Sequence, residues 1–227
     1  MSEIIKYQTF DGVTIVGDWT PVPTTVGVAI LLHMMPLDRK SWAPFAQVLA
    51  KNNVASLAID LRGHGESVNT ATGDKLDYKK FTEIQHQSYL NDVIGAVDWL
   101  VSKKYPKNQI MVVGASIGAN VALWMLQQEP LLAGAVMLSP GDYRGIDALE
   151  QAEYVKPHQS LWAAGSDSDD PEAYEAAKSV INAAAAERKA FAPYKNAGHG
   201  IHLFTSDPKL MESLAAWIKE SLLLPRS

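Results

Sequence analysis

The sequence contains no cysteine, and this absence excludes several kinds of chemistry. Without thiols the chain can form no disulfide framework, no thiolate-ligated metal site and no cysteine nucleophile. No apolar run reaches about 18 residues, the length that a membrane-spanning helix needs. Residues 1–6 have neither the basic segment nor the long apolar segment of a secretory signal. We therefore expect a soluble, cytoplasmic protein whose nucleophile, if it has one, is another residue type.

Basic side chains are also too few and too scattered to form a stripe, with 20 Lys and Arg against 25 Asp and Glu and a net charge of −5. We expect no nucleic-acid or membrane partner, and a small-molecule substrate instead. No group of His, Asp and Glu has metal-ligand spacing, so we predict no metal and no cofactor. There is no internal repeat and no linker, which favours one domain over residues 1–227.

The chain does contain a regular alternation of short apolar runs with helical patterns. Unbroken apolar runs are typical of strands buried on both faces of a parallel sheet. They occur at 26–32, 54–59, 110–113, 133–138 and 161–164. Between and after them, apolar residues recur with helical spacing at 42–49, 90–101 and 210–218. This order predicts an α/β fold, a doubly wound, mostly parallel sheet of about eight strands with helices on both faces.

Two local patterns add to this outline. Alternation in residues 4–20 around Asp11-Gly12 predicts an N-terminal hairpin at the edge of the sheet. The run Ala183–Ala186 is expected to be helical, because alanine is the best helix former.

The strongest functional signal is Gly-Ala-Ser-Ile-Gly at 114–118, directly after an apolar run and directly before a helical pattern. A serine on such a sharp turn needs nearly side-chain-free neighbours on both sides, and Gly114 and Gly118 meet that need. The alternative is a glycine-rich turn of a nucleotide-binding fold, but the G-x-G-x-x-G order is absent. We predict Ser116 as the nucleophile, with the amide of Ile117 as one oxyanion donor.

Four segments together resemble the α/β-hydrolase superfamily, in the order in which that family carries them. They are Ile30–Pro36, Ala58–Ser67, Gly114–Gly118 and Asn196–Gly200. The likeness covers nearly the whole chain and points to small lidless serine esterases and dienelactone-hydrolase-like members. The latter carry cysteine where this chain has Ser116, which favours an ordinary serine esterase. Only about two dozen residues separate Leu138 from Leu161, too few for a helical cap domain.

In this family the triad runs serine, acid, histidine, which leaves His199 and His202 as possible bases. His199 lies between two glycines in the loop that matches the family's catalytic-histidine loop, and it is our predicted base. His202 is interpreted as a loop residue. The resemblance also implies a second oxyanion donor in the loop after Leu32, at Met35 and less closely at Met34.

Three carboxylates compete for the position of the triad acid. Matching Trp162–Asp167 to the family's strand end favours Asp167, whereas counting back from the next helix favours Asp169 as the alternative. Asp170 precedes Pro171 and reads as a helix N-cap with proline at the first helical position.

These residues predict a carboxylic-ester hydrolase that acts through an acyl-enzyme and prefers short acyl chains. The same machinery could serve a thioesterase, a lactone or dienelactone hydrolase, or a cofactor-free perhydrolase. From a different class, the rival is a non-catalytic binding protein with this fold, against which stands the intact set of Ser116, His199 and a candidate acid.

Overall fold

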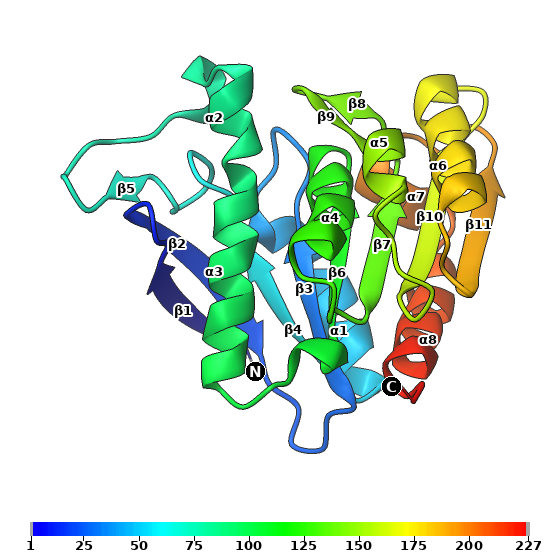
Figure 1. The fold of residues 1–227 in the computed structure, drawn as a ribbon, viewed down its shortest axis with the longest axis horizontal. Helices are drawn as coiled ribbons and strands as arrows, with labels where there is room; N and C mark the ends of the chain where they lie inside the picture. The colour runs from blue at the N-terminus through cyan, green and yellow to red at the C-terminus, as the bar shows by residue number, and fades with distance from the viewer. Residues whose placement is uncertain (1, 226–227) are drawn as a thin grey trace.

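The computed structural model describes residues 2–225 and is built around one large twisted sheet (Figure 1). Its strands are β1 (Glu3–Gln8), β2 (Val13–Thr20), β3 (Gly27–Leu32), β4 (Val54–Ile59), β5 (Asn69–Thr70), β6 (Ile110–Ala115), β7 (Gly134–Leu138), β10 (Ser160–Ser166) and β11 (Arg188–Tyr194). The order across the sheet is β1-β2-β4-β3-β6-β7-β10-β11, and the short β5 pairs with β2. Pairing is parallel from β4 to β11, and antiparallel where β2 meets β1, β4 and β5.

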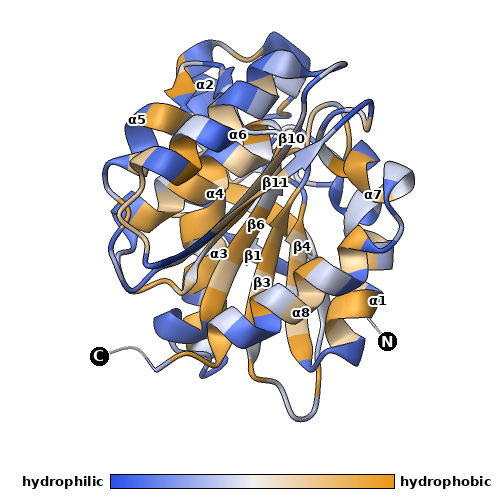
Figure 2. Cartoon of the chain, turned by 90° about the vertical axis from the view of Figure 1, so that its right-hand side faces the viewer, coloured by the Kyte–Doolittle hydropathy of each residue, from blue (hydrophilic) through white to orange (hydrophobic). Residues whose placement is uncertain are grey.

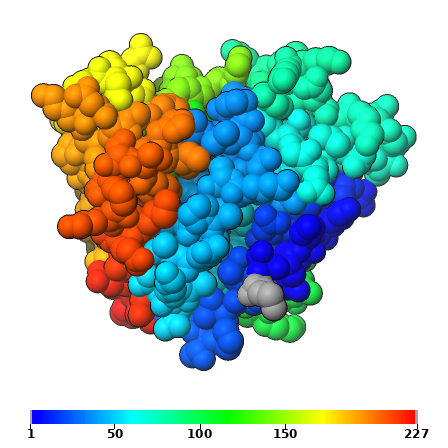
Figure 3. Space-filling model, turned by 180° about the vertical axis from the view of Figure 1, so that it is seen from behind, coloured from blue at the N-terminus to red at the C-terminus, as the bar shows by residue number. Residues whose placement is uncertain are grey.

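Helices cover both faces of this sheet, as Figure 2 shows with the sheet between its two helical layers. One face carries α3 (Tyr89–Ser102), α4 (Ile117–Gln128), α5 (Ala148–Ala152) and α6 (Pro171–Ala183). The other carries α1 (Ala43–Lys51) and α8 (Leu210–Leu222), which lie side by side in the view from behind (Figure 3). The predicted α/β class, the parallel sheet and the hairpin around Gly12 are confirmed.

The central strands are β3, β4 and β6, and every one of their residues is buried. A sheet packed on both faces holds its strand ends rigidly, and the carboxyl ends of parallel strands meet at one edge. The loops that follow β3, β6, β10 and β11 therefore converge there. The helix α2 (Glu83–Gln87) and the hairpin of β8 (Asp142–Tyr143) and β9 (Ile146–Asp147) lie at this edge, uppermost in Figure 1. Within residues 2–225, no helix combines the length and apolarity that crossing a bilayer requires.

Two local expectations need correction. Ala183–Ala186 is not a helix: α6 ends at Ala183 and the chain then extends toward β11. Burial of Ala184 and Ala186 against the core outweighs their helix propensity. Strand β10 continues to Ser166, two residues past its expected end.

No cap domain interrupts the fold between β7 and β10. That segment holds only the β8–β9 hairpin, the five-residue α5 and short connections. The loop edge is therefore covered by small elements alone, as the sequence predicts.

Candidate active site

Ser116 stands on the sharp turn between β6 and α4, with φ of 54° and ψ of −124°. The turn closes only because its neighbours lack side chains: a Cβ on Gly114 would lie 2.0 Å from the carbonyl oxygen of Gly118. A Cβ on Gly118 would lie 2.5 Å from the carbonyl oxygen of Leu32. The Ser116 amide donates to the Leu138 carbonyl at 2.9 Å. The Ser116 side chain makes no capping bond to α4, so its hydroxyl is not used by the helix.

A pocket of about 390 Å³ opens beside Ser116. It is lined by Met35, Glu83, Ser116, Ile117, Asp142, Tyr143 and Arg144. Ile117 is the first residue of α4, so its amide has no acceptor inside the helix. The structure thus brings together Ser116, Ile117 and Met35, the three residues that sequence reasoning assigned to attack and to oxyanion binding.

Met34, the less favoured oxyanion candidate, is a core residue and is only 7% exposed. A Cβ atom on Gly200 would lie 2.6 Å from the Met34 sulfur. The Met34 side chain therefore packs beneath the loop that carries His199.

His33 fixes the start of the Met34–Met35 loop. Its Nε2 accepts from the Leu61 amide at 3.0 Å, which leaves the ring proton on Nδ1 to donate to the Met34 carbonyl at 3.1 Å. The ring is fully buried, and desolvation lowers the pKa of His33, which favours the neutral form that this pattern needs. His33 therefore links the ends of β3 and β4 to the loop beside Ser116.

His199 contacts Asp170. The Nδ1 atom of the ring donates to Asp170 Oδ2 at 2.7 Å, with side-chain exposures of 32% and 16%. The ring also packs edge-on against Tyr143, whose centroid lies 6.0 Å away and which lines the Ser116 pocket. Within the described residues no hydrogen bond joins Ser116 to His199. Catalytic hydrogen bonds of this kind often tighten only when substrate is bound.

The acid expected at this position was Asp167, with Asp169 as the alternative, and the structure brings neither carboxylate to the His199 ring. Asp167 is exposed and accepts from Ser168 at 2.7 Å. Asp169 accepts from the Gly198 amide at 2.7 Å and from Ser166. The reason is the length of β10: the strand runs to Ser166, and the turn that follows swings Asp170 inward.

The segment from 25 to 145, more than half of the chain, matches the family model described as serine aminopeptidase, S33. The chain belongs to this S33 family of hydrolases. A kynurenine formamidase of Meyerozyma guilliermondii is 30% identical over 70 residues, which are 31% of this chain and 27% of that protein. The chain thus spans about a quarter of that curated relative in the match.

Solved structures share the fold of this S33-family hydrolase at low sequence identity. An esterase of Pyrococcus furiosus is 18% identical with a TM-score of 0.78, covering 99% of this chain and 91% of that one. A dienelactone hydrolase of Anabaena variabilis is 16% identical with a TM-score of 0.74, covering 98% and 97%. An α/β hydrolase of Penicillium sp. sh18 is 14% identical with a TM-score of 0.80, covering 99% and 100%. The α/β-hydrolase fold, suspected from four motifs, is confirmed.

Sequence reasoning missed the residues that build the far wall of the Ser116 pocket in this hydrolase. Buried Asn120 of α4 anchors the β8–β9 hairpin: its amide group donates to the carbonyls of Gly141 and Ile146, both at 2.6 Å, and its oxygen accepts from the Gly141 amide at 3.0 Å. The two turn residues, Arg144 and Gly145, have φ of 57° and 72°. A glycine in a two-residue turn was the available signal.

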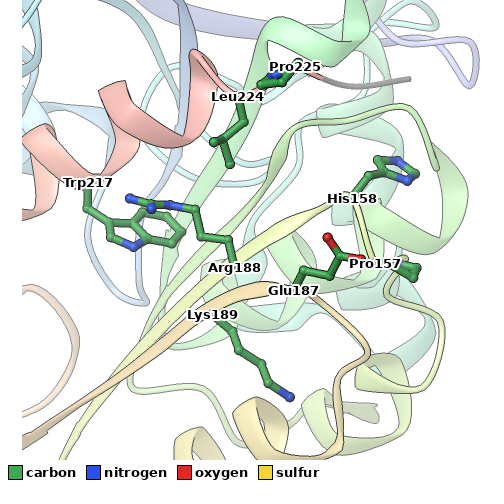
Figure 4. Close-up of a pocket in the computed structure, with 8 residues that line it drawn as sticks. All are labelled: Pro157, His158, Glu187, Arg188, Lys189, Trp217, Leu224 and Pro225. Atoms are coloured by element: carbon green, nitrogen blue, oxygen red, sulfur yellow. The ribbon is translucent and has the colours of Figure 1, made fainter.

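A larger cavity, of about 860 Å³, lies at the opposite edge of the sheet, where β10 and β11 begin (Figure 4). Arg188 lies over the Trp217 ring at 5.2 Å there and pairs with Glu220 at 2.8 Å. The cavity contains none of the predicted site residues. Among residues 2–225, no group of three or more His, Asp and Glu is arranged to hold a metal ion.

Proposed function

We propose that this S33-family hydrolase is a serine esterase that cleaves small carboxylic esters through an acyl-enzyme, using Ser116, His199 and Asp170. The observation that carries the proposal is the backbone of Ser116. A left-handed conformation costs a residue with a side chain about 1–3 kcal/mol, and such strain clusters at active sites. Here two obligatory glycines maintain it, at the start of a helix and at the mouth of a pocket.

The contact between His199 and Asp170 supports the role of the histidine as general base. Because Nδ1 donates to the carboxylate, the neutral ring leaves Nε2 unprotonated and able to accept the Ser116 proton. When the imidazolium forms, the carboxylate at 2.7 Å stabilises its charge. His199 then returns the proton to the leaving alcohol, and a water molecule activated by the same ring hydrolyses the acyl-enzyme.

The oxyanion of each tetrahedral intermediate would be bound by the amides of Ile117 and Met35, both from residues that line the pocket. Ile117 adds the positive end of the α4 dipole. Preorganised donors of this kind typically contribute about a hundred- to a thousandfold each to the rate.

The pocket restricts the substrate. Its volume of about 390 Å³ is near the lower end of the range for ligand sites, roughly 300–1,000 Å³. Glu83, Asp142 and Arg144 place charges on its walls, so a small ester with polar character fits better than a long hydrocarbon chain.

A fluorophosphonate probe followed by mass spectrometry tests the nucleophile, and a panel of substrates tests the reaction. We expect one adduct, on Ser116, and turnover of p-nitrophenyl acetate. The panel should also include a thioester, a γ-lactone and an aryl formamide, the last because of the match to a kynurenine formamidase.

Higher kcat/KM on any of these three substrates than on matched esters would change the substrate class but retain the mechanism. An unlabelled protein that turns over none of them would favour the non-catalytic binding protein and refute the proposal.

A further inference from the structure

Side chains from other segments hold the backbone of the loop that carries His199. Three of its backbone amides, on both sides of the histidine, donate to side-chain oxygens from the ends of β7 and β10. The pairs are Ala197 N–H with Ser166 Oγ at 2.9 Å, Gly198 N–H with Asp169 Oδ2 at 2.7 Å, and Gly200 N–H with Ser139 Oγ at 2.9 Å. Each of these backbone amides is therefore satisfied by a side chain from another segment of the protein.

Such restraint is needed because of the glycines. Gly198 and Gly200 have φ of 79° and 60°, and glycine populates many other conformations at little cost. A histidine between two glycines has no intrinsic preference for one direction. The hydrogen bonds to the neighbouring backbone amides must therefore set the direction of the histidine.

Two of the three acceptors act as one unit. The Ser166 hydroxyl donates its proton to Asp169 Oδ1. The lone pairs of Ser166 Oγ are then free to accept from the Ala197 amide. The other carboxylate oxygen of Asp169 is free to accept from Gly198. The Ser166 hydroxyl and, next, the Gly198 amide hold the pKa of Asp169 below its usual value. Ser166 is fully buried, so water does not replace its contacts.

The third acceptor, Ser139, is itself in an unusual conformation. It follows β7 directly, is fully buried, and has φ of 53°. Its amide donates to the Ala164 carbonyl of β10 at 2.8 Å, and its hydroxyl is aimed at Gly200. Backbone strain of this kind clusters at functional sites, and here it accompanies a hydroxyl that holds the histidine loop.

We propose that Ser139, Ser166 and Asp169 form a clamp of positioning residues that sets the direction of the His199 ring. This inference rests on the proposed role of His199 as the base. The adjacent carboxylates then divide the work: Asp170 binds the ring, and Asp169 binds the backbone that carries it. None of the clamp residues contacts the reacting atoms.

Asp169→Ala tests the clamp, and Asp167→Ala is its matched control. The control removes the same charge from the same turn, but the Asp167 carboxylate accepts from Ser168 and not from the amides of the His199 loop. A misplacement of about 1 Å can cost about a hundredfold in rate. For Asp169→Ala we expect kcat to fall about ten- to a hundredfold with KM nearly unchanged. Asp169→Asn keeps an acceptor for the Gly198 amide and should restore part of the rate.

A structural role alone would lower the melting temperature without lowering kcat. That result, or equal losses for Asp169→Ala and Asp167→Ala, would overturn the clamp. The rate of fluorophosphonate labelling separates the two proposals. A wild-type chain that stays unlabelled refutes the esterase, whereas labelling that is equally fast in wild type and Asp169→Ala refutes the clamp alone. The imidazole chemical shifts of His199 at one fixed pH report the ring's surroundings in either case: a change in Asp169→Ala and not in Asp167→Ala supports the clamp.

Discussion

Replacing Asp170 by asparagine is the sharpest test of the proposed triad. The side chain keeps its shape, so the fold and the start of α6 should be unaffected. Its carboxylate, however, makes a single short contact to the His199 ring, at 2.7 Å and with 16% exposure. An amide NH₂ in that place turns toward Nδ1 and favours the tautomer with its proton on Nε2. The ring can then no longer take a proton from Ser116.

The magnitude follows from this change of tautomer. Comparable substitutions at a triad acid lower kcat by about ten-thousandfold. A factor of ten corresponds to about 1.36 kcal/mol, so the expected loss is about 5 kcal/mol of transition-state stabilisation. Because Asp170 is largely enclosed, solvent offers little compensation.

The assay is steady-state hydrolysis of p-nitrophenyl acetate near pH 8, with circular dichroism to verify folding. Asp167→Asn is the control, since that carboxylate is exposed and accepts a hydrogen bond from the adjacent Ser168. We expect Asp167→Asn to retain wild-type kcat within a few fold. The reasoning is refuted if Asp170→Asn keeps more than a tenth of the activity, or if Asp167→Asn is the crippled variant.

Three further outcomes are expected. Ser116→Ala should fold normally and lose about four to six orders of magnitude in ester hydrolysis, because triad members act as a unit; near-normal turnover would remove Ser116 from the mechanism. Without a cap domain, kcat/KM should be highest for acetyl to butyryl esters and show no jump at a lipid interface; faster turnover of long chains in micelles would contradict the small pocket. Burial lowers the pKa of His64 to about 3, so an unfolded chain binds a proton that the folded chain rejects. The contribution of His64 to stability is therefore fully present above about pH 6.5 and is lost as the pH drops toward 3. The decrease of the urea midpoint with falling pH should be shallower in His64→Gln.

The sequence predicted the fold well because its strongest patterns agree with tertiary burial. The runs at 54–59 and 110–113 lie in the central strands, where both faces are packed and every residue is buried, and Ser56 is the one polar side chain among them. The helical run Ala183–Ala186 failed for the opposite reason: Ala184 and Ala186 are buried by contacts distant in sequence, which propensity does not report.

The carboxylate that contacts His199 could not be predicted, because three carboxylates lie within four residues and differ only in direction. The Asp-Pro pair located the start of α6 correctly, and from this Asp170 was assigned to capping. The structure has Asp170 at the N-cap position, but with φ of −148° and ψ of 56° and with no capping bond. Asp170 lacks the extended backbone conformation of a usual N-cap residue, and its carboxylate is therefore available to His199.

The same departure recurs at all three proposed triad residues. Ser116 is at the N-cap position of α4, Asp170 at that of α6, and His199 at that of the short turn Gly200–His202, and none of the three side chains caps its helix. A helix start gives a residue a fixed backbone at the end of a rigid element. A side chain that caps that helix is occupied, whereas one that forgoes the cap can point into a site. Cap position therefore predicts where these residues lie but not what their side chains contact. A polar N-cap residue at the carboxyl edge of such a sheet should be considered for catalysis as well as for capping.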